Sequence, residues 1–119
     1  LKLRLMRAVL ARTQERCDAS GVPLLLVVLP SRVDLCDDLE FAWVDRERWP
    51  ASRPRELTEA FIRIADELRI PYLDLFPHFA DDPCRLYLRG GDSHWNEAGQ
   101  ALAARLVADR IRPGLLLER

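Results

Sequence analysis

The chain has 119 residues, 49% apolar and 31% charged, a composition typical of one small globular domain and unlike that of a disordered segment. Eighteen basic residues face 19 acidic ones, so the net charge of −1 provides no field to hold nucleic acid. The cysteines Cys17, Cys36 and Cys84 form no motif for zinc or redox work, and no apolar run approaches the ~20 residues of a membrane span. We interpret the arginines, which alternate with acids along the chain, as a solvated surface.

The first elements predicted are a helix and a buried strand. Apolar residues from Leu3 to Cys17 recur at three- and four-residue steps, which predicts one face of a helix that ends near Gly21. The next stretch, VPLLLVVLP, is continuously apolar, which is typical of a strand covered on both faces in a parallel sheet. Pro30 ends it.

Residues 31–54 show no period, and we interpret them as a long loop or insert. Three aromatic residues of this stretch, Phe41, Trp43 and Trp49, are expected to anchor the loop to the core. A lid or a sugar-stacking surface is the alternative, in which Trp43 would contact a substrate.

The remaining elements complete an alternation of helices and strands. Residues Leu57 to Leu68 follow a helical period, IPYLDLF reads as a second strand, and Asp81 to Arg89 is a turn-rich connection. Asn96 can cap a third helix that Pro113 and Gly114 end. This order predicts an α/β domain with parallel strands. Two strands are too few for a covered sheet, so further strands are expected from residues absent here or from another chain.

The segment RGGDSHWNEAGQ, residues 89–100, carries the most chemistry. Asp92 and His94 lie two residues apart after a pair of glycines. In a tight turn the carboxylate can accept a hydrogen bond from one imidazole nitrogen and leave the other nitrogen as a base. A helix-capping Asp beside a surface His is the alternative for these residues taken alone.

The longer string GDSHWNEAGQALAARL resembles the last conserved block of the SGNH (GDSL-like) hydrolase superfamily. Many members place the acid three residues before the histidine. The spacing of two found here is that of a branch with polysaccharide O-acetyl-modifying enzymes. More loosely, GVPLLLVVLPSRVDL resembles the penultimate core strand, and LTEAFIRIADELRIPYLDLFPHF resembles the next helix and last strand, with Asp74 where the family often has Asp.

The resemblance implies a three-layer, flavodoxin-like parallel sheet flanked by helices, with residues 1–119 as a single domain or as the C-terminal part of one. It also implies ester cleavage or acyl transfer, on a carboxylic ester such as a sugar O-acetyl group, without metal or organic cofactor. In that chemistry an upstream serine attacks the ester, His94 moves the proton and Asp92 orients His94. Trp95, Ser31 and Trp43 are further candidates for substrate contact.

Two serines of the chain compete for the role of nucleophile. Gly91-Asp92-Ser93 matches the family's nucleophile letters, but no later Asp-His block follows it, and adjacent side chains rarely aim at one point. Ser31 follows a buried strand but has no flanking glycine for a sharp turn. Asn96 is the chain's only asparagine, so the family's oxyanion asparagine is missing. We therefore expect the nucleophile block to lie outside this sequence, and the isolated chain to be inactive.

Other functions stay open. We expect His78 to be a loop residue with a packed ring, since no ligand spacing joins it to His94, Asp92 and Cys84 as a metal site. One alternative is a non-catalytic carbohydrate- or protein-binding module with a vestigial Asp-His pair. Another is a structural domain that forms a homo-oligomer through an open sheet edge. Many relatives are exported to the periplasm or beyond, but no residue pattern here assigns a compartment.

Overall fold

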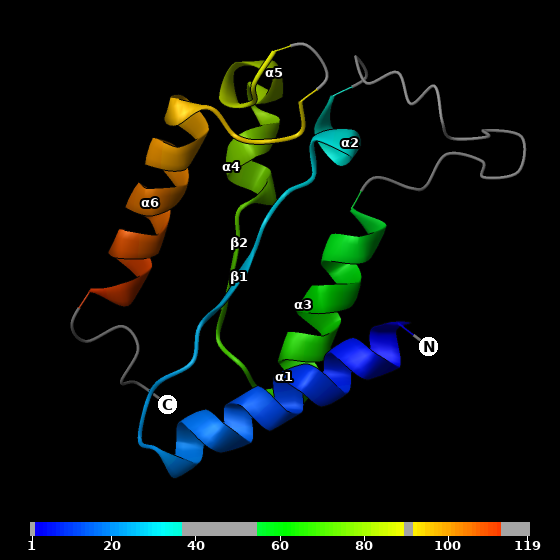
Figure 1. The fold of residues 1–119 in the computed structure, drawn as a ribbon, viewed down its shortest axis with the longest axis vertical. Helices are drawn as coiled ribbons and strands as arrows, with labels where there is room; N and C mark the ends of the chain where they lie inside the picture. Colours follow the sequence, from blue (N-terminus) through cyan, green and yellow to red (C-terminus); the bar gives the residue numbers. More distant parts are fainter. Residues whose placement is uncertain (1, 37–54, 90–91, 113–119) are drawn as a thin grey trace, which may run out of the picture.

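The computed structural model describes residues 2–36, 55–89 and 92–112 (Figure 1). Its elements in chain order are α1 (Lys2–Ala19), β1 (Leu26–Val28), α2 (Arg32–Leu35), α3 (Glu56–Leu68), β2 (Tyr72–Asp74), α4 (Phe76–Ala80), α5 (Pro83–Leu86) and α6 (Glu97–Ile111). The three long helices and both strands lie where the sequence predicts them. None of the described helices combines the length and apolar character that a membrane crossing requires.

The two strands form a small parallel sheet, as expected for an α/β arrangement. Val27 pairs with Leu73 at the centre of the register, and Leu75 N–H donates to the carbonyl of Val28 at 3.1 Å. Each strand is only three residues long, so most of the apolar run from 22 to 30 lies outside the ladder. Within the strand, Leu26 and Val27 are half-buried and Val28 is buried, whereas Leu29, which follows the strand, is 57% exposed, so the expected cover extends over β1 but not to the end of the apolar run.

Helices lie on both sides of the strands, with α6 on one side and α3 on the other (Figure 1). On the α6 side, Val27 and Leu73 pack against the buried core. The residues of this core are Leu75, Phe79, Tyr87 and Ala103. On the other side, α3 contacts both strands and buries Ala60, Ile64 and Ala65, consistent with its helical apolar period.

Helix α1 packs on α3 but buries none of its residues. An ion pair at 3.1 Å joins Arg7 to Glu67 of α3, and half or more of each side chain is exposed. Leu5 and Val9 are 65% and 50% exposed. The helix ends as predicted, because Gly21 adopts a φ of 65° and its N–H donates to the carbonyl of Asp18.

An apolar groove runs along the free edge of β1. It has a volume of about 270 Å³ and is lined by β1, by Ser31 and Asp34 near α2, and by Leu57, Thr58 and Phe61 of α3. Because hydrogen-bonding groups alternate along a strand, the N–H and C=O of Val27 face away from β2 toward this edge. The part of the chain that the structure describes supplies no third strand there.

The stretch from 31 to 54 is described only at its start. Ser31 caps the one-turn helix α2, its hydroxyl accepting a hydrogen bond from Val33 N–H at 3.3 Å. Phe41, Trp43 and Trp49, and with them the expected lid or anchor, lie outside the described residues.

Candidate functional site

The segment that carries Asp92 and His94 is held between α5 and α6 by backbone pairing. Tyr87 and Trp95 form an isolated antiparallel bridge. Leu88 N–H donates to the carbonyl of His94 at 2.9 Å, and Asn96 N–H donates to the carbonyl of Leu86 at 3.0 Å. Residues 86–88 therefore fix the backbone from His94 to the start of α6.

Asn96 secures the start of α6, as the sequence predicts. Its Oδ1 accepts a hydrogen bond from Gly99 N–H at 3.1 Å, and its Nδ2 donates to the carbonyls of Arg85 at 2.7 Å and Tyr87 at 3.1 Å. Gly99 allows a close approach here, because a Cβ atom at this position would lie 2.4 Å from the carbonyl oxygen of Leu86. One side chain thus joins α5, the bridge and α6.

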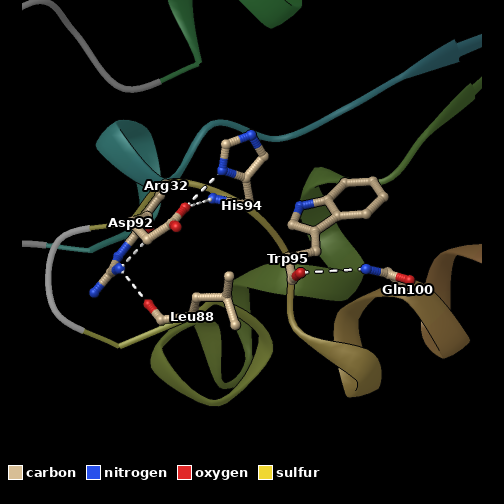
Figure 2. Close-up of polar contacts among 6 residues, drawn as sticks. All are labelled: Arg32, Leu88, Asp92, His94, Trp95 and Gln100. Atoms are coloured by element: carbon tan, nitrogen blue, oxygen red, sulfur yellow. Dashed lines mark hydrogen bonds and ion pairs between the residues drawn. The ribbon is translucent and has the colours of Figure 1, made fainter.

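Asp92 and His94 point toward one another (Figure 2). Oδ1 of Asp92 lies 2.6 Å from Nδ1 of His94 and also accepts a hydrogen bond from the His94 backbone N–H at 2.8 Å. Two hydrogen bonds from His94 hold the pKa of Asp92 below its ordinary value. The one from its backbone N–H has the larger effect, and the one from its ring has the smaller. The carboxylate is therefore ionised at neutral pH and orients the imidazole.

The rest of the imidazole is open to solvent. The His94 side chain is 83% exposed and that of Asp92 is 45% exposed. With Nδ1 donating to the carboxylate, the neutral ring carries its lone pair on Nε2, and no described residue hydrogen-bonds to that nitrogen. This arrangement can accept a proton from a hydroxyl placed at Nε2 and stabilise the resulting imidazolium.

Arg32 is the residue at this site that the sequence reasoning missed. Only 4% of it is exposed, so the interpretation of the arginines as a solvated surface is wrong at this position. Its Nη1 donates to the backbone carbonyls of Leu88 and Asp92, both at 2.6 Å (Figure 2). The sequence offered one signal: Arg32 follows an apolar strand and a capping serine, and in parallel sheets sites lie at the carboxyl ends of the strands.

Trp95 turns its ring away from His94 and toward α4 (Figure 2). The indole lies against Phe79, with ring centroids 4.9 Å apart, and is half-buried. Next to it the hydroxyl of Tyr87 donates to the carbonyl of Pro30 at 3.0 Å, and burial raises the pKa of this phenol. The rings of Phe79, Tyr87 and Trp95 thus pack together in the core next to the segment that carries His94. The role of Trp95 as a substrate contact stays a prediction.

The remaining candidates either form no hydrogen bond with the pair among the described residues or lie outside those residues. Ser93 is exposed, and no hydrogen bond joins its hydroxyl to either histidine among the described residues. We expected His78 to be a loop residue with a packed ring, and this prediction is wrong: His78 is an exposed residue of α4. Within residues 2–36, 55–89 and 92–112, no group of three His, Cys, Asp or Glu side chains could hold a metal ion.

A family model described as an SGNH hydrolase-like domain, acetyltransferase AlgX, matches residues 2–119. Searches of the curated proteins and of the solved structures found no match.

Proposed function

The chain belongs to the SGNH hydrolase-like family of the acetyltransferase AlgX, and on this premise we propose that Asp92 and His94 are the acid and base of a Ser-His-Asp site for acyl transfer. The observation that carries the proposal is the 2.6 Å contact between Asp92 Oδ1 and His94 Nδ1, with the opposite edge of the ring free. An Asp-His pair in this orientation is what a serine nucleophile requires for activation.

In the proposed reaction a serine from outside these residues attacks the carbonyl carbon of an ester. Nε2 of His94 accepts the serine proton as the new C–O bond forms, and then donates that proton to the leaving alcohol. The acyl group is thereby attached to the serine. A second hydroxyl, from water or from a sugar, gives its proton to His94 and takes the acyl group by the same steps in reverse. Asp92 stabilises the imidazolium in both halves.

The family description supports an acetyl group as the acyl group, and an O-acetylated sugar or another carboxylic ester as the substrate class. No metal or organic cofactor takes part in this scheme. The serine and the donors of an oxyanion hole would come from the remainder of a three-layer, flavodoxin-like sheet, in which β1 and β2 are two of the parallel strands. The groove along β1 leaves room for such a continuation.

The test compares His94→Ala with His78→Ala in the full protein, with p-nitrophenyl acetate as the substrate. His78 is the matched control, because it is also an exposed histidine but lies on α4 outside the pair. We expect His94→Ala to lower kcat by about 10²- to 10⁴-fold, the usual contribution of a general base, and His78→Ala to leave it unchanged. Full activity in His94→Ala would rule out the proposed base.

A second experiment locates the serine. The 119-residue chain by itself should show no saturable turnover, because the described residues place no nucleophile at Nε2 of His94 and, in the proposed scheme, the donors of the oxyanion hole come from elsewhere. Saturable ester hydrolysis by the chain alone, abolished by Ser93→Ala, would instead make Ser93 the nucleophile.

The exposure of the imidazole favours one other function, a non-catalytic module that binds a carbohydrate or protein through this surface. At 83% exposure the His94 side chain is open enough to contact a large ligand directly. Calorimetric titration with an O-acetylated oligosaccharide separates the two readings. Binding without turnover, weakened in His94→Ala, would identify a binding module.

A further inference from the structure

We propose that Arg32 is a positioning residue, which fixes the segment bearing Asp92 and His94 at the carboxyl end of β1; this inference rests on the proposed function. Its two hydrogen bonds are the geometric basis. Nη1 of Arg32 lies 2.6 Å from the carbonyl oxygen of Leu88 and 2.6 Å from that of Asp92. One nitrogen therefore holds two carbonyls that are four residues apart in the chain, one of which belongs to the acid itself.

The burial of Arg32 indicates that these contacts are specific. An arginine residue that is only 4% exposed has lost most of its hydration, which costs free energy unless its donors find acceptors inside the protein. Hydrogen bonds from a charged donor to carbonyl oxygens are stronger than neutral ones and hold their geometry more tightly. A surface arginine could contact the same carbonyls transiently, whereas Arg32 is buried where it makes these contacts.

The backbone of Arg32 is held in place as well as its guanidinium group. Arg32 is the first residue of α2, which Ser31 caps, and only Leu29, Pro30 and Ser31 separate it from β1. The carbonyl of Pro30 accepts the hydroxyl of the buried Tyr87. The guanidinium is therefore connected to the sheet by a short, bonded path, and it transmits the position of the sheet to the backbone of Asp92.

The charge of Arg32 acts in the same direction as its geometry. The guanidinium favours the ionised form of Asp92 and adds to the two hydrogen bonds from His94 in holding the pKa of Asp92 down. Loss of Arg32 would remove this charge and loosen the His94 contacts. Both changes would raise the pKa of Asp92.

The experiment uses Arg32→Met in the full protein, with Arg55→Met as the matched control. Arg55 is half-buried and pairs with a carboxylate, Asp74, at 2.8 Å, but no hydrogen bond or ion pair among the described residues joins it to Asp92 or His94. We expect Arg32→Met to lower kcat for p-nitrophenyl acetate about ten- to hundredfold with little change in KM, as for a small misplacement of a catalytic group. The pKa of Asp92, followed by NMR on isotope-labelled aspartate, should rise. Arg55→Met should change neither quantity, and Arg32→Lys, which restores the charge, should recover part of both.

The results separate this inference from the proposed function. If His94→Ala is inactive while Arg32→Met keeps the wild-type kcat and the wild-type Asp92 titration, Arg32 does not position the pair although the pair is catalytic. If His94→Ala is fully active, the proposed function fails. The inference about Arg32 is then judged by the Asp92 titration: if Arg32→Met leaves it unchanged, the inference is overturned independently of activity. Should Arg32→Met not fold, Arg32→Lys decides, since unchanged kcat and unchanged Asp92 titration in that variant would contradict a positioning role.

Discussion

The core beside α6 and the free edge of β1 are packed to very different degrees. On the α6 side, Leu75 and Phe79 are completely buried and Tyr87 is 2% exposed. The free edge of β1 is the open side: Leu29 and Leu57 are 57% and 60% exposed there, although α3 buries Ala65 against the strands. The Asp92–His94 pair is built on the well-packed side. The hydrogen-bonded pair is therefore supported by core packing, whereas the open side leaves apolar surface for another element to cover.

The largest effect on stability is expected from Phe79→Ala, which attacks the packed side. Phe79 contacts Tyr87 edge-on at 6.1 Å and Trp95 at 4.9 Å between ring centroids. Removing the ring leaves a cavity under both, so the free energy of unfolding should fall by about 3–5 kcal/mol. Urea unfolding measures it. A loss below about 1 kcal/mol would mean that this core is loosely packed.

Asn96→Ala should have a smaller effect on the same side. It removes the cap of α6 and leaves the carbonyls of Arg85 and Tyr87 without their donor. We expect a loss of about 1–3 kcal/mol, the range for a lost cap together with unsatisfied acceptors. Asn96→Ser is the control, because its hydroxyl can still accept from a backbone N–H as a cap but provides no amide to reach the two carbonyls. A Ser variant as unstable as the Ala variant would show that the cap contributes little.

Acid should weaken the Asp92–His94 contact by a small amount. Because the pKa of Asp92 is lowered in the folded chain, its contribution to stability is present above the unfolded pKa of about 3.9 and is lost as the pH falls through the folded value. The stability difference between the protein and Asp92→Asn, measured by urea unfolding, should therefore shrink as the pH falls below about 4. A difference that grew over this acidic range would contradict this sign.

The smallest effect is expected on the open side, from Leu57→Gln. Leu57 is 60% exposed in the groove along β1, so the substitution should change the free energy of unfolding by no more than about 0.5 kcal/mol. Thermal unfolding of the full protein provides the measurement. A loss above about 1.5 kcal/mol would show that another element covers Leu57 there, and the contrast between the two sides would then hold only for these 119 residues.

Local sequence signals predict much of this fold. Apolar spacing locates α1, α3 and α6, the apolar run locates β1, and Asn96 caps α6 as its side chain allows. Such signals depend on nearby residues, and they are read directly from the chain. The apolar run does not show where the cover ends: β1 is buried or half-buried, but Leu29 directly after it is 57% exposed. An apolar run indicates a preference for burial but not what is available to bury it.

The site was harder to predict because its geometry depends on contacts distant in sequence. The spacing of Asp92 and His94 suggests their hydrogen bond, which forms within a single turn. Arg32 acts on carbonyls 56 and 60 residues away, and no local pattern distinguishes it from the exposed arginines of the chain. Helix α4, which carries His78, begins after Leu75 with Pro77 in its first turn, and it is too short for an apolar period to show.

At the bridge that precedes α6, successive side chains point in opposite directions, and this has a consequence for how the sequence can change in evolution. His94 and Trp95 are neighbours, yet one ring meets solvent and the other rests on Phe79. A substitution at Phe79 that moves the indole would also shift the adjoining peptide, which bears the imidazole. Changes in the hydrophobic interior can therefore alter the orientation of the His94 ring without changing Asp92 or His94.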